Sequence, residues 1–166
     1  QGLRGCSGVK REETMVGIVI VSHSCTLAEG VVELCRMTAP NANMLAAGGM
    51  EDGGLGTSYE KIKGAVECAD EGDGVLILAD MGSSVMTAEM VLEDLEGVKA
   101  ELADCPLVEG AVVAAISSAA GQSMEDIRDS LRKVWESRKL AWGCGMQHGE
   151  GENDEQRYDR AVSGNE

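Results

Sequence analysis

The sequence predicts one α/β domain built on an open, doubly wound parallel sheet. Two apolar runs rich in β-branched residues, 16–22 and 74–80, are typical of strands buried on both faces. Segments with helical spacing of apolar residues separate these runs from shorter strands, and such alternation favours parallel pairing through right-handed crossovers. The 166 residues are enough for one hydrophobic core, and the sequence contains no internal repeat.

The first half of the chain is expected to alternate strands and helices. Apolar residues recur at helical spacing over 27–38, directly after the first strand. A short strand over 43–47 then leads into a loop, 48–56, that holds five glycines. Ser58 is placed to cap the next helix. One face of that helix carries Ile62, Ala65, Val66 and Ala69.

The second half is expected to add three helices and one weak strand, and the first of these helices starts at Ser83 or Ser84. Ser123 with Asp126 resembles a capping box at the start of the last helix. One face of this last helix carries Ile127, Leu131, Val134 and Trp135. The core is expected to be filled in part by Met37, Met44, Met86 and Met90. The expected elements cover 83–95 (helix), 98–103 (strand), 111–120 (helix) and 124–140 (helix).

The ends of the chain are expected to lie outside the domain. Residues 1–14 begin with Gln-Gly, which suggests a tag remnant or a flexible N-terminus, and Met15 is the expected native start. The domain itself is expected over 15–140. The stretch 141–166 has almost no apolar periodicity, and we expect it to be a disordered acidic tail.

The net charge of −15 disfavours nucleic acid and anionic membranes as partners, because both would repel the chain. It suits partners that present a basic docking face. No apolar run reaches about 18 residues, and no signal peptide precedes the first strand, so we expect a cytoplasmic protein without a membrane partner. The six cysteines form no C-x-x-C pair, and we expect reduced thiols.

Motifs of the common cofactor-binding and hydrolase families are missing from the sequence. The glycine loop lacks the Lys of a P-loop, no G-x-G-x-x-G follows the first strand, and no G-x-S-x-G is present. Cys144 and His148 have metal-binding side chains, but two ligands in a glycine-rich tail are a weak signal. We therefore expect neither a cofactor nor a metal.

Polar residues follow the two most apolar strands at the point where each strand ends. Ser22-His23-Ser24 follows the first strand, and Asp80-Met81-Gly82-Ser83-Ser84 follows the third. Ligands of doubly wound sheets bind beyond the carboxyl ends of the strands, where the strand order reverses. If these two strands are central neighbours, about 4.8 Å apart, His23 lies within side-chain reach of Asp80.

A histidine beside a carboxylate suits phosphoryl transfer. Asp80 would accept a hydrogen bond from one ring nitrogen of His23, which leaves the other nitrogen, by preference Nε2, free to attack phosphorus. Backbone amides at 26–27 and 83–84, at the starts of two helices, suit an incoming dianion. The loop beside the site contains Gly54 and Gly56. Phosphate-binding hydroxyls are expected from Ser22, Ser24, Thr57, Ser58, Ser83 and Ser84.

The motifs V-S-H-S, D-M-G-S and P-L-V-E-G together resemble the mannose-type enzyme IIA family of the bacterial phosphotransferase system (PTS). More narrowly, they resemble its DhaM group, the phosphotransferase subunits of PTS-dependent dihydroxyacetone kinases. The resemblance covers about residues 15–140, and each motif alone would be weak. The matching stretches are 17–24 with 27–30, 46–49 with 54–57, 74–84 and 106–110.

The resemblance implies a role and a set of partners. His23 would be the phosphorylated histidine, and Asp80 its hydrogen-bonding partner. The donor would be the phosphocarrier protein HPr, and the acceptor ADP bound in DhaL, whose ATP product would phosphorylate dihydroxyacetone on DhaK. The resemblance also implies a homodimer. Some DhaM proteins continue into HPr-like and enzyme I-like domains, and this chain, which ends in an acidic tail, is expected to depend on a separate HPr.

Three other interpretations stay open. A sugar-transport enzyme IIA would donate to a IIB protein, but such members more typically read D-x-x-G-G-[ST]-P where this chain has Asp80-Met-Gly-Ser-Ser84. A non-catalytic regulatory domain would be phosphorylated to control another protein. In a flavodoxin-like binding domain, His23 would be an ordinary loop residue, Asp80 a helix cap and the glycine loop a flexible connection.

Overall fold

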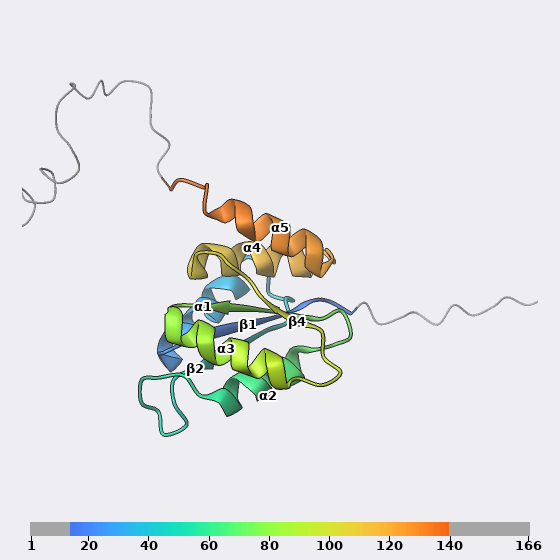
Figure 1. Ribbon diagram of the computed structural model, residues 1–166. Coiled ribbons are helices and arrows are strands. Elements are labelled where there is room, and N and C mark those ends of the chain that lie inside the picture. Colours follow the sequence, from blue (N-terminus) through green and yellow to red (C-terminus); the bar gives the residue numbers. More distant parts are fainter. Residues whose placement is uncertain (1–13, 140–166) are drawn as a thin grey trace, which may run out of the picture.

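Four parallel strands form one sheet in the order β2-β1-β3-β4 in the computed structural model, which describes residues 14–139 (Figure 1). The two central strands are the ones predicted from their continuous apolar runs, and their predicted adjacency is confirmed. The strands are β1 (Gly17–Ser22), β2 (Met44–Gly48), β3 (Val75–Ala79) and β4 (Ala100–Leu102).

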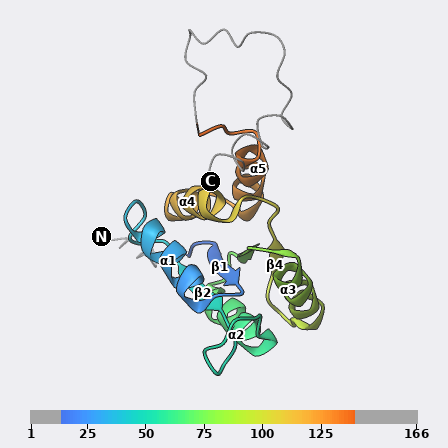
Figure 2. The same cartoon turned by 90° about the vertical axis from the view of Figure 1, so that its left-hand side faces the viewer.

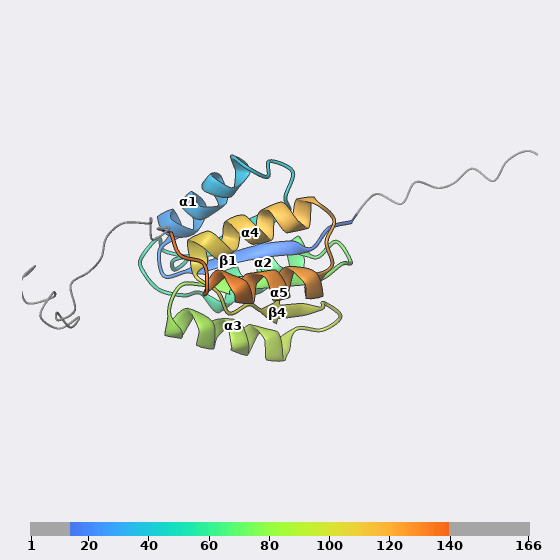
Figure 3. The same cartoon turned by 90° about the horizontal axis from the view of Figure 1, so that it is seen from above.

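Five helices cover the two faces of the sheet (Figure 2). One layer holds α1 (Cys25–Arg36), α4 (Leu107–Ala119) and α5 (Met124–Val134), and from above α4 lies between α1 and α5 (Figure 3). The other layer holds α2 (Tyr59–Ala69) and α3 (Gly82–Asp94). The predicted α/β architecture with a parallel sheet is therefore confirmed.

Alternation along β1 divides the core into two halves. Ile18 and Ile20 pack toward the layer of α1, α4 and α5, whereas Val19 and Val21 pack toward α2 and α3. All four side chains are fully buried, because successive residues of a strand point to opposite faces and both faces are covered. This burial explains why the run reads as continuously apolar rather than alternating.

The order of the strands reverses between β1 and β3. The chain leaves β1 toward β2 on one side and leaves β3 toward β4 on the other, so the segments that follow the two central strands diverge. Val21 pairs with Ala79 in the last rung of this ladder, which brings the residues just beyond both strands to the same edge of the sheet. Doubly wound folds bind their ligands at such a point.

Helix α4 begins at Leu107, earlier than the predicted start near residue 111. Pro106 precedes the first turn, where its missing N–H costs nothing, and its carbonyl accepts the first helical bond from Gly110 at 2.7 Å. A side chain at Gly110 would collide with the Cys105 Sγ, so this glycine lies inside the helix for packing and does not mark its boundary.

Helix α5 ends at Val134, well before the predicted end at residue 140, and Trp135 is its C-cap. Trp135 was expected on the buried face but is exposed. The predictions for residues 1–13 and 141–166 lie outside the described residues, as do Cys6, Cys144 and His148. The proposed domain limits remain predictions.

The expectation that four methionines fill the core is confirmed only for Met44 on β2. Met37 follows the last turn of α1 and is exposed. Met86 and Met90 are also exposed, because α3 turns Ala88 and Val91 toward the sheet and leaves the opposite face to solvent.

Helix α1 buries only part of the apolar set that recurs at helical spacing over 27–38: Val31 and Cys35 are buried as expected, but other members of the set are not. Leu27 and Leu34 are partly exposed. The side chains that enter the core are Ala28, Val31, Val32 and Cys35.

Within residues 14–139, no helix is both long enough and apolar enough to cross a membrane. The cysteines of this part of the chain are unpaired, as predicted: Cys25, Cys35, Cys68 and Cys105.

Candidate active site

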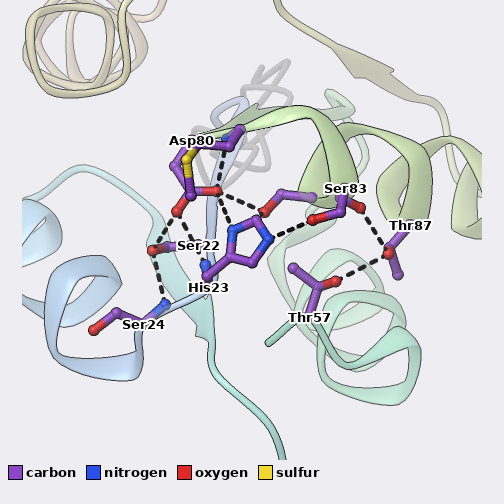
Figure 4. A network of polar contacts seen from close by, with 9 residues as sticks. Ser22, His23, Ser24, Thr57, Asp80, Ser83 and Thr87 are labelled. Carbon is purple, nitrogen blue, oxygen red and sulfur yellow. Dashed lines mark hydrogen bonds and ion pairs between the residues drawn. The ribbon is translucent and has the colours of Figure 1, made fainter. Parts of the chain in front are cut away.

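His23 lies immediately beyond β1, at the edge where the strand order reverses. Its side chain is 25% exposed and that of Asp80, just beyond β3, is 11% exposed. The His23 Nδ1 lies 3.0 Å from the Asp80 Oδ1, which confirms the predicted proximity (Figure 4). The backbone N–H of His23 also donates to the Asp80 Oδ2 at 3.0 Å. One carboxylate therefore holds both the ring and the main chain of the histidine.

The remaining lone pairs of Asp80 are also occupied. The Ser22 hydroxyl donates to Oδ2 at 2.8 Å, and the Ser84 hydroxyl donates to Oδ1 at 2.6 Å. The backbone N–H of Met81 reaches Oδ1 at 2.7 Å. Asp80 is thus not the N-cap of α3, which is Met81. Burial acts to raise the pKa of the Asp80 carboxyl, but the hydrogen bonds from Ser84, His23 and Ser22 outweigh burial and hold that pKa far below its usual value.

These contacts determine the tautomer of the neutral His23 ring. An ionised Asp80 only accepts hydrogen bonds, so a proton between it and Nδ1 must come from Nδ1. The Ser84 hydroxyl lies 3.0 Å from the same nitrogen, but its hydrogen points to Asp80, and it too can only accept there. Nδ1 therefore carries the proton, and Nε2 has the free lone pair.

Ser83 occupies the other side of the ring, where its hydroxyl is in hydrogen-bond contact with Nε2 (Figure 4). With the proton on Nδ1, this hydroxyl donates to the Nε2 lone pair. Ser83 lies in the first turn of α3, and no side chain caps that helix. The uncapped start of α3 suits an anion that arrives at Nε2.

A second set of contacts positions Ser83 through its backbone carbonyl. The Thr87 hydroxyl donates to the Ser83 carbonyl at 2.9 Å and lies 3.1 Å from the Thr57 hydroxyl (Figure 4). Thr57 is therefore linked to the site through Thr87 and not by contact with the His23 ring. The sequence prediction missed Thr87, although its position one helical turn after Ser83 was a usable signal.

The glycine loop is joined to the main chain beside the histidine. The Gly56 N–H donates to the His23 carbonyl at 2.9 Å, and the Gly49 N–H donates to the Ser22 carbonyl at 3.0 Å. Lys61 on α2 closes the base of the loop, where its Nζ lies 3.2 Å from the Gly48 carbonyl oxygen. The loop is thus a positioning element, and sequence reasoning did not single out Lys61.

The role of Gly54 is confined to the loop itself. Its N–H binds the Asp52 side chain at 2.9 Å, and its carbonyl accepts from the Met50 N–H at 2.8 Å. These bonds form a tight turn within the loop.

The structure gathers half of the predicted hydroxyl groups around His23 and Asp80, namely those of Ser22, Ser83 and Ser84. The Ser24 hydroxyl caps α1 through the Leu27 N–H at 3.2 Å, and the Ser58 hydroxyl caps α2 through the Lys61 N–H at 3.2 Å. The start of α1 is thus occupied by its own cap. Two helix starts were predicted to receive the incoming dianion, and only the start of α3 places side chains on the His23 ring. Among residues 14–139, no group of three or more metal-binding side chains comes together.

The fold and this site define a phosphotransferase-system IIA domain of the mannose class. The chain matches the family EIIA-man, described as "PTS system fructose IIA component", over residues 17–128, and it belongs to that family. The match spans both central strands and reaches into α5, so it includes every residue of the site described above.

Curated relatives narrow the comparison to the DhaM group. The phosphotransferase subunit DhaM of the PTS-dependent dihydroxyacetone kinase of Lactococcus lactis is 38% identical over 118 residues, which cover 71% of this chain and 94% of the relative. The phosphoryl donor subunit DhaM of PEP-dependent dihydroxyacetone kinase 2 from Listeria innocua is 36% identical, with 72% and 99% covered. The Pantoea ananatis DhaM is 41% identical, but the match spans only 29% of that longer protein.

Solved structures share the fold. The crystal structure of a protein of unknown function is 30% identical, with a TM-score of 0.65, and the match covers 78% of this chain and 99% of that one. A sigma-54 interaction domain protein from Enterococcus faecalis has a TM-score of 0.62 at 21% identity, which shows the common fold alone.

Proposed function

We propose that this chain is the phosphocarrier subunit of a PTS-dependent dihydroxyacetone kinase. In this proposal His23 accepts a phosphoryl group from phospho-HPr and passes it to ADP bound in DhaL, and the ATP so formed phosphorylates dihydroxyacetone on DhaK. The protein acts in the cytoplasm as a homodimer. The observation that carries the proposal is the placement of Asp80 and Ser84 on Nδ1, because it leaves Nε2 as the nucleophile.

Phosphoryl acceptance requires one bond to form and one to break. The Nε2 lone pair forms a bond to phosphorus, while the bond between phosphorus and the donor nitrogen breaks and its electron pair returns to the donor. Ser83 must first release Nε2, and from the start of α3 its hydroxyl then donates to a phosphoryl oxygen. Positioning and charge stabilisation supply most of the catalysis in such transfers.

The Asp80 carboxylate supports the phosphorylated state as well as the free one. A ring with a proton on Nδ1 and phosphorus on Nε2 is cationic, and the ionised carboxylate 3.0 Å from Nδ1 stabilises that charge. A cationic ring is also a better leaving group than a neutral one. When an oxygen of the ADP β-phosphate attacks phosphorus, the N–P bond breaks and its electron pair returns to Nε2.

The names of the relatives favour a dihydroxyacetone kinase over a sugar transporter as the destination of the phosphoryl group. Relatives that match along nearly their whole length are DhaM subunits. This chain also has Met-Gly-Ser-Ser after Asp80, and the structure gives both serines a contact with the ring.

A comparison of two acceptors tests which protein receives the phosphoryl group from His23. The protein is phosphorylated with enzyme I, HPr and phosphoenolpyruvate, freed of the donors, and then mixed with DhaL–ADP or with a IIB protein. The proposal predicts rapid loss of the phosphoryl group to DhaL–ADP, with ATP as the product, and slow loss to IIB. Transfer to IIB alone would assign the chain to sugar transport. A His23→Ala chain, carried through the same steps, reports any transfer that bypasses the site.

A further inference from the structure

Lys61 is a cation held beside the edge of the sheet that carries His23. It lies in the first turn of α2 and is half-buried. Its Nζ lies 2.9 Å from the Met50 carbonyl oxygen and 3.2 Å from the Gly48 carbonyl oxygen. Gly48 ends β2 and pairs with Ser22, the residue before His23. The ammonium group therefore binds the neighbouring strand at the level of Ser22, one residue before the nucleophile.

No carboxylate within residues 14–139 forms an ion pair with Lys61. This is unexpected in a chain with 29 acidic and 14 basic residues. Glu51, in the same loop as the Met50 carbonyl, accepts instead from the Ser58 hydroxyl at 3.3 Å. A half-buried ammonium group gives up part of its hydration, and here backbone carbonyl oxygens replace that water. Lys61 is therefore bound to the main chain of the loop rather than to a side chain.

The loop that Lys61 binds is anchored at both ends to the main chain beside the site. One bond runs from the Gly49 N–H to the Ser22 carbonyl at 3.0 Å, and another from the Gly56 N–H to the His23 carbonyl at 2.9 Å. Gly49 stands between the two carbonyl groups that bind Lys61, and its φ of 68° marks the point where the chain leaves β2. Five glycines make the loop costly to order, and a cation fixed at its base limits the conformations that it can adopt.

His23 is bound from two sides through its main chain. From the end of β3, Asp80 accepts the His23 N–H at 3.0 Å, and from the loop, Gly56 donates to the His23 carbonyl. The position of the ring therefore depends on the neighbours of β1 on both sides. An error of about 1 Å at a reacting atom can lower a rate about 100-fold, so the loop side is as important as the carboxylate side.

We propose that Lys61 is a positioning residue for phosphoryl transfer at His23. Its ammonium group fixes the base of the glycine loop, and the loop holds the His23 main chain from the β2 side. This role rests on the proposed function and extends it to a residue that forms no hydrogen bond with the ring, whose partners are Asp80, Ser83 and Ser84.

Amide hydrogen exchange in the unphosphorylated full chain tests the contact between Lys61 and the loop directly. Lys61→Met keeps the length of the side chain but removes its charge and its donors. It is expected to speed exchange at the Gly49 and Gly56 amides several-fold, because local opening of the loop becomes less costly. The Ile20 amide, in the centre of β1, should exchange as in wild type. Lys61→Arg keeps both the charge and the donors and should restore slow exchange.

Lys63→Met is the matched control. Lys63 lies on the same helix, is also half-buried and carries the same charge. Residues two positions apart do not share a face of a helix, so Lys63 is directed away from the carbonyl groups that bind Lys61. The control is expected to behave like wild type in exchange and in transfer. Equal effects of the two methionine variants would show only a general loss of charge and would overturn the role of Lys61.

Single-turnover transfer from phospho-HPr tests the effect on the reaction. Lys61→Met is expected to lower the maximal rate about tenfold or more, in the range for residues that orient a reacting group. The donor concentration at half-saturation should stay nearly unchanged, because the variant alters the position of His23 and not the binding of the donor. Lys61→Arg should recover most of the rate. A change confined to the half-saturating concentration would overturn the positioning role and make Lys61 a docking contact for the donor.

The outcomes separate this role from the proposed phosphoryl transfer. A wild-type chain that HPr does not phosphorylate overturns the proposed function. Unchanged exchange at Gly49 and Gly56 in Lys61→Met overturns the role of Lys61, even where wild type is phosphorylated. Slower transfer with unchanged exchange also overturns it, and would assign the ammonium group to direct stabilisation of the phosphoryl group. Faster exchange together with slower transfer, both reversed in Lys61→Arg, is the expected result.

Discussion

The Asp80 carboxylate binds His23 at two points: Oδ1 lies 3.0 Å from the ring Nδ1, and Oδ2 accepts the backbone N–H at 3.0 Å. The two contacts fix the position of the residue and the orientation of its ring together. The bond to the main chain does not depend on the ring. Substitutions at Asp80 should therefore disturb the position of His23 even though the imidazole side chain of His23 is intact.

Asp80→Asn is expected to slow both phosphorylation of His23 and transfer to the acceptor, by about 10- to 100-fold. Asparagine can donate to Nδ1 through its amide, which favours the wrong tautomer, and it no longer neutralises a cationic ring. Rapid-quench measurement of phosphohistidine checks the rate. The circular dichroism spectrum should remain that of wild type, and a wild-type rate would remove Asp80 from the mechanism.

Ser84→Ala is expected to raise the pKa of the Asp80 carboxyl, because the Ser84 hydroxyl donates to Oδ1 at 2.6 Å and lowers that pKa. Alanine is a good helix former and leaves the first turn of α3 in place. Carbon-detected NMR of the Asp80 carboxyl against pH measures the shift. Ser130→Ala, on α5 in the other layer of helices, serves as the control and should leave the Asp80 titration unchanged.

Thr87→Val is expected to slow phosphoryl transfer at His23 by a few fold and to leave the fold intact. The substitution keeps the shape of the side chain but removes the hydroxyl that binds the Ser83 carbonyl and approaches Thr57. Thr87→Ser retains that hydroxyl and should restore most of the rate. Equal rates for the valine and serine variants would show that Thr87 only fills space.

The sequence was sufficient for the fold and for the centre of the site. Strands β1 and β3 are buried on both faces, so their composition alone identified them as central, and adjacency then brought His23 to Asp80. It was not sufficient for α1, because Leu27 and Leu34 extend the apolar arc of that helix beyond the arc that the core can cover. For Thr87, the bond to the Ser83 carbonyl follows from helical spacing, whereas the approach to the Thr57 hydroxyl is made only in the folded chain.

The free energy of unfolding should fall with decreasing pH as Asp80 becomes protonated. The native pKa of Asp80 lies below the ordinary value of 3.8, so this contribution is fully present above about pH 4 and is lost as the pH falls through the native pKa. One proton accounts for at most about 1.4 kcal/mol per pH unit. Urea unfolding at a series of pH values should show a shallower slope below pH 4 for Asp80→Asn, and identical slopes would contradict the assignment.

Gly48→Ala is expected to lower the free energy of unfolding by about 1–3 kcal/mol, the range for overpacked sites. Its Cβ would meet the Ser24 carbonyl oxygen and, at 2.8 Å, the Cβ of Ala28, at the contact between the end of β2 and the start of α1. Denaturant unfolding measures the change. Gly64→Ala, which adds a Cβ in open space, should instead stabilise the chain slightly.

His23 is the central residue of the proposed mechanism, as the site of phosphorylation. The full chain is incubated with enzyme I, HPr and phosphoenolpyruvate, and its intact mass is recorded. We predict a gain of one phosphoryl group that is stable in base, labile in acid and absent from His23→Ala, with phosphorus on Nε2 by ³¹P NMR. No mass gain in the wild-type chain, or an equal gain in His23→Ala, would contradict the account.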